Sequence, residues 1–308
     1  MLQNTLDLCA KLIYTINKSQ QKGQIMKVFK VDLYEYFKVE KPQNADGVLY
    51  CYLVNQAPGI NINRKHPAML ILPGGGYSHT SDREAEPVAL KFLSKDYNAF
   101  ILRYSCKPVK HPVQLQETAM AMAYIRSNAN ELNVREDKVA VIGFSAGGHL
   151  AGMTSLLYND ESLNFLGDKK ALVRPNETIY MYPVVSNSGR AHVSSFNNIC
   201  GDDEQLKERL SLENLVTSES PACFIVSTFE DGSVPCQNSL KLATAYDDKR
   251  VPFSIHIFEK GVHGMSIGEQ SVYNTGLPYL SAMAKDYPKW VDMALVWLEE
   301  RGYKIIDK

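Results

Sequence analysis

The chain has 308 residues, of which 45% are hydrophobic and 22% are charged, a composition typical of a soluble globular protein. Its 33 Lys and Arg residues nearly balance its 34 Asp and Glu residues, and the two signs are mixed along the chain, so neither nucleic acid nor an anionic membrane surface is predicted as a partner. Six scattered cysteines without a C-x-x-C pair predict neither a metal site nor a disulfide framework. No cofactor is expected.

The first 25 residues are predicted to form an appended amphipathic helix, because Leu and Ile recur there at roughly helical spacing. A frayed extension is the alternative. Asp7 and Lys11 interrupt the apolar residues, and no small-residue cleavage site follows. The segment is therefore a poor secretory signal, and no later run approaches the length that spans a bilayer. A cytoplasmic location is expected.

From Met26 onward, strand-like and helix-like patterns alternate along the chain. Residues 27–37 and 46–54 are predicted to form a leading antiparallel pair. The further strands are expected at 67–73, 98–105, 137–144, 178–185, 221–229 and 252–259, and the helices near 84–95, 113–132, 237–247 and 289–300. Strands separated by helices predict an α/β fold whose mostly parallel central sheet carries helices on both faces. Residues 26–308 are predicted to be one domain.

The stretch GFSAG, residues 143–147, lies between a predicted strand and a predicted helix. A G-x-S-x-G turn of this kind holds its serine in a strained conformation, with the hydroxyl projecting from the carboxyl end of the strand. Gly143 and Gly147 are expected because a Cβ would collide with the tight turn. The pattern also occurs by chance in ordinary turns, so Ser145 as a nucleophile requires a base and an acid elsewhere.

Beyond the helix that starts at the serine, three histidines follow, at positions 192, 256 and 263. His263 lies between two glycines just past the last predicted strand, where a loop could carry its ring over the serine, and it is predicted to be the base. His256 lies within that strand, and His192 follows no strand end. His149 is one helical turn after the serine and is expected to pack.

The acid is expected just after a strand, between the serine and the base in the chain. The stretch FEDGSVP offers Glu230 and Asp231. Asp231 is preferred, because the turn Asp-x-x-Val-Pro places its carboxylate at the strand end and lets Pro235 begin the next helix. Glu230 is expected to be a solvated loop charge.

Three glycines follow the strand that ends at Pro73. A loop in this position can direct N–H groups toward an oxyanion, and the predicted donors are the N–H groups of Gly75, Gly76 and Ala146. A glycine-rich loop can also bind phosphate. However, no Gly-Lys-Ser/Thr ending and no G-x-G-x-x-G pattern is present.

These motifs in this order resemble the α/β-hydrolase esterases, in particular the branch of acetyl-esterase-like and acetylxylan-esterase-like proteins. The resemblance rests on PGGGY at 73–77, GFSAGGHLA at 143–151, the run at 211–239 and FEKGVHG at 258–264. It implies an α/β-hydrolase fold with Ser145 as nucleophile, Asp231 as acid, His263 as base and the three oxyanion donors named above. The related hormone-sensitive-lipase pattern begins HGGG, whereas this chain has Pro73 in place of the histidine, so a differently anchored loop is expected.

The expected activity is hydrolysis of a short-chain acyl ester, most simply an acetyl group on a small sugar or oligosaccharide. The region between residues 185 and 221 is polar and lacks the apolar face of a lipase lid, and Tyr273 and Tyr279 are candidates to stack on sugar rings, with core packing as the alternative. A serine peptidase of the prolyl-oligopeptidase kind is a rival, but such enzymes usually carry a large second domain. A non-catalytic binding module is another rival, although no member of the triad is lost. The sequence leaves the number of subunits open, with a homodimer among the expectations.

Overall fold

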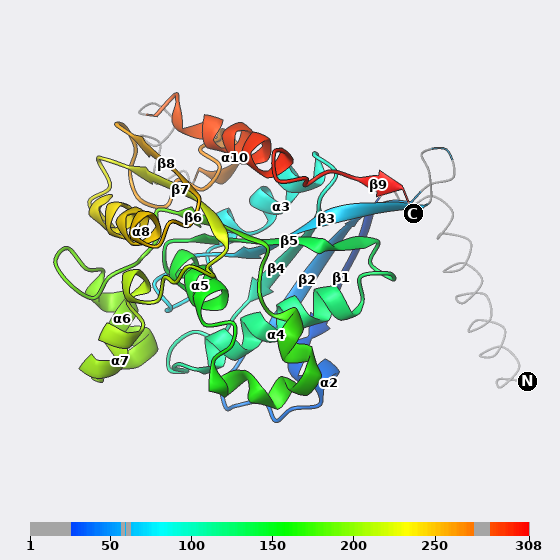
Figure 1. Cartoon of the computed structure of the whole chain (residues 1–308), viewed down its shortest axis with the longest axis horizontal. Helices are drawn as coiled ribbons and strands as arrows, with labels where there is room; N and C mark the ends of the chain where they lie inside the picture. Colours follow the sequence, from blue (N-terminus) through cyan, green and yellow to red (C-terminus); the bar gives the residue numbers. More distant parts are fainter. Residues whose placement is uncertain (1–25, 57–58, 60–62, 274–283, 308) are drawn as a thin grey trace, which may run out of the picture.

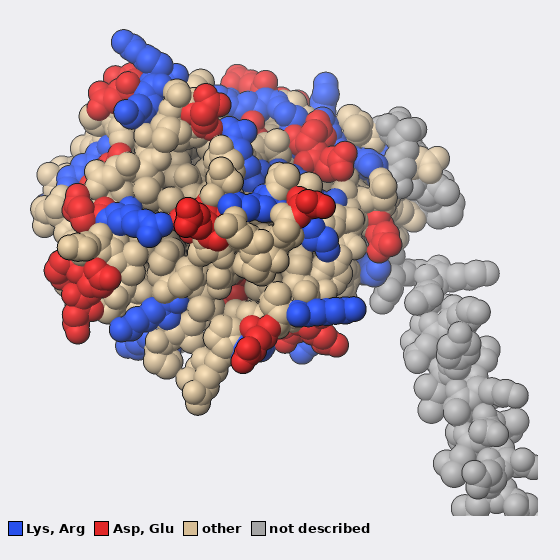
Figure 2. Space-filling view, turned by 60° about the horizontal axis from the view of Figure 1, so that its bottom comes forward, with Lys and Arg blue, Asp and Glu red and all other residues tan. Residues whose placement is uncertain are grey.

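The computed structural model describes residues 26–56, 59, 63–273 and 284–307. The helix expected in residues 1–25, and with it the predicted division between an extension and a catalytic domain, lies outside the described residues. Tyr279 lies outside them as well. The described helices include none long and apolar enough to cross a bilayer. Figure 2 shows basic and acidic side chains interspersed over the face that it displays.

The centre of the molecule is a sheet of eight strands in the order β1-β2-β4-β3-β5-β6-β7-β8 (Figure 1). The first two pairs, β1 with β2 and β2 with β4, are antiparallel, and all later pairs in this order are parallel. A short ninth strand pairs antiparallel with the start of β3. The bounds are β1 Met26–Asp32, β2 Val48–Val54, β3 Arg64–Leu72, β4 Asn98–Arg103, β5 Val134–Phe144, β6 Glu177–Met181, β7 Ala222–Thr228, β8 Phe253–Phe258 and β9 Ile306–Asp307.

Helices cover both faces of the sheet, as the alternating pattern predicts (Figure 1). One face carries α4 (Val113–Ser127), α5 (Ala146–Leu156) and α8 (Gln237–Asp248), and the other carries α3 (Glu86–Leu93) and α10 (Trp290–Glu299). In β3, Leu70 and Leu72 join the first core, whereas Met69 and Ile71 join the second. Both faces of β3 are therefore buried, which explains why its sequence is a continuous apolar run.

The prediction of one strand over residues 27–37 is wrong in its second half. The strand ends at Asp32, whose carboxylate accepts the N–H groups of Tyr34 at 3.0 Å and Glu35 at 3.3 Å. Asp32 is the N-cap of the short helix α2, Leu33–Phe37. Because its carboxylate satisfies these two N–H groups, they need no partner from a neighbouring strand. The antiparallel pairing of β1 with β2 is confirmed.

The polar region after β6 contains two helices that the sequence analysis left without structure, α6 (Val193–Cys200) and α7 (Glu204–Arg209). Asp203 caps α7 by accepting the N–H of Leu206 at 2.9 Å. Short 3-10 helices complete the described structure, at Asp82–Glu84, Glu161–Leu172, Leu212–Asn214, Gln270–Val272 and Tyr287–Lys289.

The parallel strands all end at one edge of the sheet, which is where ligands bind in open α/β sheets. The glycine-rich loop follows β3, the G-x-S-x-G turn follows β5, and the segments with Asp231 and His263 follow β7 and β8. Four segments far apart in the sequence are therefore brought to the same edge.

Candidate active site

Ser145 lies at the sharp turn between β5 and α5, with backbone angles φ 54° and ψ −119°. A non-glycine residue rarely adopts these angles, and the strain is maintained only where the surroundings fix it. Here the N–H of Ser145 donates to Met181 at 2.9 Å, and its carbonyl accepts from His149 and Val184 at 3.1 Å. The serine is thus held rigidly at the edge of the sheet.

The two glycines of the turn have no room for a side chain. A Cβ on Gly143 would lie 2.0 Å from the carbonyl oxygen of Gly147, and one on Gly147 would lie 2.1 Å from that of Leu72. Both contacts are with backbone atoms, which cannot move aside without displacing β3 or α5. The close approach of strand, turn and helix accounts for the glycine spacing around Ser145.

Three of the predicted residues form a continuous chain of hydrogen bonds. Ser145 Oγ lies 2.8 Å from His263 Nε2, and His263 Nδ1 lies 2.7 Å from Asp231 Oδ2. A carboxylate oxygen only accepts, so Nδ1 carries the proton that bonds to Asp231. The neutral ring then presents an unprotonated Nε2 to the serine hydroxyl, as a general base requires.

The carboxylate of Asp231 is oriented by the turn that contains it. Its Oδ1 accepts the N–H groups of Ser233 and Val234, each at 2.9 Å, which leaves Oδ2 for His263. The Asp231 side chain is fully buried. Its neighbour Glu230 instead pairs with Lys260 at 2.8 Å and accepts the N–H of Gly261, and the Lys260 ammonium lowers the pKa of the Glu230 carboxyl.

Two other histidines lie away from the serine hydroxyl. His256 packs on Phe224 and hydrogen-bonds to Ser254. His149 is buried in α5, where its Nε2 donates to the carbonyl of Leu210 at 2.8 Å and its Nδ1 accepts from the hydroxyl of Tyr77. Burial lowers the pKa of His149 to about 4, so this ring stays neutral and has both nitrogens engaged.

His192, by contrast, lines the same cavity as Ser145 and His263. It precedes α6 and pairs with Ser195 Oγ at 2.8 Å. Burial, together with the neighbouring His263, lowers the pKa of His192. The sequence analysis set this residue aside because no strand precedes it, and its place in the cavity follows from α6, which the polar sequence did not reveal.

The glycine-rich loop after β3 faces the serine turn. Gly75 and Gly76 both have positive φ angles, 127° and 63°, which side chains rarely tolerate. Within the described residues, the N–H groups of Gly75, Gly76 and Ala146 have no hydrogen-bond partner, and Ala146 is the first residue of α5, whose N–H lacks an intrahelical acceptor. All three predicted donors are therefore free to bind a ligand oxygen.

Glu84 anchors the glycine-rich loop in place of a histidine, a role that the sequence analysis missed. This residue is 3% exposed. Its two oxygens accept the N–H of Gly74 at 2.8 Å and the hydroxyl of Tyr182 at 2.6 Å. On the other side of the loop, Asn198 of α6 donates to the carbonyl of Gly76 at 2.8 Å.

These residues enclose a cavity of about 410 Å³. Its lining is mainly polar and includes both Ser145 and His263, with the residues Gly75, Gly76, Ser78, His79, Ser81, Arg83, Glu84, Lys107, His192, Ser194, Asn198, Ser233 and Gly264. No group of three His, Cys, Asp or Glu side chains among the described residues could hold a metal ion. Tyr273 lies in a neighbouring cavity and donates its hydroxyl to the carbonyl of Gly268 at 2.8 Å.

The chain matches the BD-FAE family model over residues 59–246. Among solved structures, the acetyl ester-xyloside bifunctional hydrolase of Caldicellulosiruptor lactoaceticus is 30% identical, with a TM-score of 0.75 over 89% of this chain and 97% of that one. The α/β hydrolase MGS-M1, from a Medee basin deep-sea metagenome library, is 33% identical, with a TM-score of 0.71 over 90% and 98% of the two chains.

Two curated relatives are longer proteins. Endo-1,4-beta-xylanase B of Butyrivibrio fibrisolvens is 32% identical over 233 residues, which are 73% of this chain and 36% of that protein. Acetylxylan esterase of Xylanibacter ruminicola is 29% identical over 233 residues, or 73% and 45% of the two. The chain thus spans less than half the length of either relative. The α/β-hydrolase fold predicted from the motifs is confirmed, and the chain belongs to the BD-FAE family, within the α/β-hydrolase superfamily.

Proposed function

We propose that the protein is a serine carboxylesterase that removes short acyl groups, chiefly acetyl, from small sugars or oligosaccharides. The hydrogen-bonded chain Ser145–His263–Asp231 is the observation that carries the esterase mechanism. The sugar ester is supported by the acetylxylan esterase and the acetyl ester-xyloside hydrolase among the similar proteins, and by the polar lining of a cavity of about 410 Å³.

In the proposed mechanism His263 Nε2 takes the proton of Ser145 as its oxygen attacks the ester carbonyl. The negative charge that develops on the carbonyl oxygen is stabilised by the N–H groups of Gly75, Gly76 and Ala146, which have no other partner in the described structure. Asp231 stabilises the imidazolium formed in this step.

The tetrahedral intermediate then collapses with loss of the alcohol. The bond between the carbonyl carbon and the alcohol oxygen breaks, and His263 gives its proton to that oxygen, which leaves an acyl group on Ser145. Water attacks the acyl-enzyme with His263 again as the base, and the acid product and the free serine result.

The mechanism is tested by replacing Ser145 with Ala. Because the members of a triad act as a unit, kcat for p-nitrophenyl acetate should fall by roughly 10⁶-fold. A fluorophosphonate probe should label the parent protein at Ser145 and not the variant, as mass spectrometry of the peptides would show. A non-catalytic binding module would show no labelling, and a variant that keeps a tenth of the activity would refute the assignment.

The acyl preference is tested with p-nitrophenyl acetate, butyrate, octanoate and decanoate. Each methylene that enters an apolar pocket contributes about 0.8 kcal/mol, equivalent to roughly a fourfold gain in kcat/KM. A short-acyl enzyme should lose this gain beyond butyrate, because the cavity lining is mainly polar. A steady rise up to decanoate contradicts the short-acyl proposal, and faster turnover of aminoacyl amides would favour the peptidase.

A further inference from the structure

We propose that the alcohol half of the substrate carries a carboxylate, as an acidic sugar does, and that Arg83 binds it. This inference rests on the esterase function proposed above and narrows its substrate class. It is drawn from an arginine at the catalytic cavity that has no acidic partner among the described residues.

Arg83 lines the cavity that contains Ser145 and His263. Its guanidinium lies against the backbone next to the catalytic histidine, since a Cβ built on Gly264 would be 3.2 Å from Arg83 Nη2. The backbone of Arg83 is fixed independently, because its carbonyl accepts the hydroxyl of Ser266 at 2.6 Å. The guanidinium thus lies next to Gly264, the residue that follows His263.

This position is on the side of the leaving group. In acyl transfer the base that takes the serine proton later gives it to the departing alcohol, so the alcohol must lie next to His263 Nε2. The proposed oxyanion donors come instead from the glycine-rich loop after β3 and from the first residue of α5. A charge beside Gly264 is accordingly placed to contact the alcohol half of the ester.

No carboxylate neutralises this arginine in the described structure, where Arg83 takes part in no ion pair and its side chain makes no hydrogen bond. Glu84 is the acidic residue of the cavity lining, and its two oxygens accept from Gly74 and Tyr182. A second cation, Lys107, lines the same cavity and is likewise without an acidic partner among the described residues.

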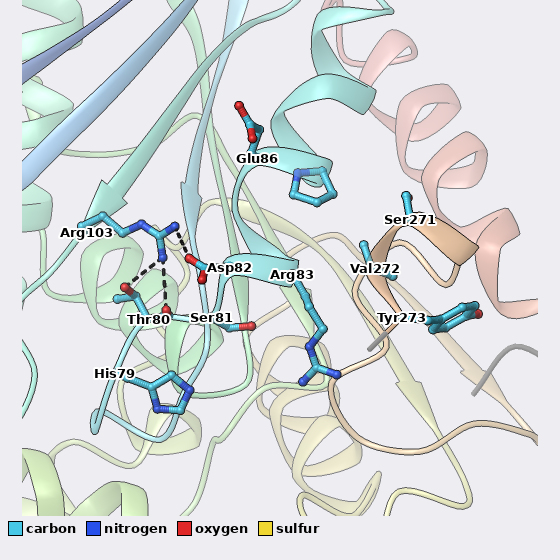
Figure 3. A pocket seen from close by; sticks show the side chains of 11 residues that line it. His79, Thr80, Ser81, Asp82, Arg83, Glu86, Arg103, Ser271, Val272 and Tyr273 are labelled. Carbon is cyan, nitrogen blue, oxygen red and sulfur yellow. Dashed lines mark hydrogen bonds and ion pairs between the residues drawn. The ribbon is translucent and has the colours of Figure 1, made fainter. Parts of the chain in front are cut away.

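Arg103 shows how a nearby arginine behaves when its role is structural. Its guanidinium binds the carboxylate of Asp82 at 2.7 Å and both oxygens of Thr80. Figure 3 shows the neighbouring cavity, which Arg83 also lines: dashed lines join Arg103 to these two residues, whereas no such line reaches the guanidinium of Arg83. An unpaired guanidinium there presents a forked donor that fits a carboxylate.

The test compares an anionic and a neutral acetate ester of one shape, 4-acetoxybenzoate and methyl 4-acetoxybenzoate. For each enzyme the ratio of the two kcat/KM values is measured at low ionic strength, and ratios are compared between enzymes so that the intrinsic reactivity of the esters cancels. Arg83→Gln should lower the ratio roughly tenfold, while Arg83→Lys should retain most of it, because the charge is kept. Added salt should reduce the ratio for the parent enzyme, for Arg83→Lys and for the control below, which all keep the charge at position 83, but not for Arg83→Gln.

Arg250→Gln is the matched control, because it removes one positive charge at the exposed turn before β8, at the opposite edge of the sheet. It should leave the ratio unchanged. If Arg83→Gln leaves the ratio unchanged, because both esters lose activity equally or neither does, the proposed carboxylate binding is wrong. The esterase function would still stand in that case. Failure of the parent enzyme to cleave either ester would instead refute the esterase function itself.

Discussion

Glu84 provides a direct test of how the glycine-rich loop is held. We predict that Glu84→Gln lowers both the stability of the fold and the rate of ester hydrolysis. The carboxylate accepts two buried donors, the N–H of Gly74 and the hydroxyl of Tyr182. Glutamine has the same shape but only one accepting oxygen.

The magnitude follows from counting donors. If the amide oxygen keeps the N–H of Gly74, the amide NH₂ faces Tyr182, whose hydroxyl already accepts from the N–H of Ser266 at 2.9 Å. The tyrosine proton then has no acceptor. One buried donor left unpaired costs about 1–3 kcal/mol, and the free energy of unfolding should fall by that amount.

The catalytic effect comes through the position of the surrounding loops. A displacement of the glycine-rich loop or of the Tyr182–Ser266 contact by about 1 Å costs on the order of 10²-fold in rate, so we expect kcat to fall roughly ten- to hundredfold. KM should change little, because Glu84 acts on the transition state through loops that it positions.

The assays are equilibrium urea unfolding and steady-state hydrolysis of p-nitrophenyl acetate. The control is Glu86→Gln, two residues along the chain, whose exposed carboxylate accepts the hydroxyl of Tyr52 at 3.3 Å and makes no other hydrogen bond within the described part of the chain. Its unfolding free energy and kcat should stay close to those of the parent. If the two variants behave alike in both assays, Glu84 does not position the loop.

Two further predictions concern buried or adjacent carboxylates. Asp231→Asn should lower kcat by on the order of 10⁴-fold, since an amide NH₂ facing His263 Nδ1 favours the wrong tautomer. Glu230→Gln is the control and should keep near-parental kcat. A larger loss of kcat in Glu230→Gln than in Asp231→Asn would contradict the role of Asp231. Burial raises the pKa of Glu117 from 4.5 to about 7, so its contribution to stability is present below pH 4.5 and is lost as the pH rises through 7. Relative to Glu117→Gln, the unfolding free energy of the parent should therefore fall by about 3 kcal/mol from pH 4.5 to 8, and parallel curves would show that Glu117 does not titrate in this range.

The parts of the site that the sequence predicted are those with local signals. The turn around Ser145 is recognisable because its signal spans only five residues. Neither Gly143 nor Gly147 has room for a Cβ, so both positions require glycine. Asp231 is recognisable because its carboxylate accepts the N–H groups of the residues two and three positions later, Ser233 and Val234. The sheet was predictable for a similar reason, since strands buried on both faces are apolar throughout.

The parts that were not predicted depend on contacts between distant segments. Glu84 shows no motif, and its partners Gly74 and Tyr182 come from different strand ends. Helix α6 has a polar sequence, yet Asn198 within it reaches the glycine-rich loop, and His192, which directly precedes it, lines the cavity. The strand expected through residue 37 ended early because a single capping side chain, Asp32, outweighed the alternating pattern.

One buried pair connects the two halves of the candidate site. Tyr182 donates to Glu84, which holds the glycine-rich loop, and accepts the N–H of Ser266, which follows the histidine loop. The same ring packs edge-on against His263, with centroids 4.9 Å apart. Since the proposed oxyanion donors and the proposed base must keep a fixed separation across Ser145, a single contact between their loops serves both. The residue before the glycines can then be Pro73, because the anchor of the loop comes from Glu84.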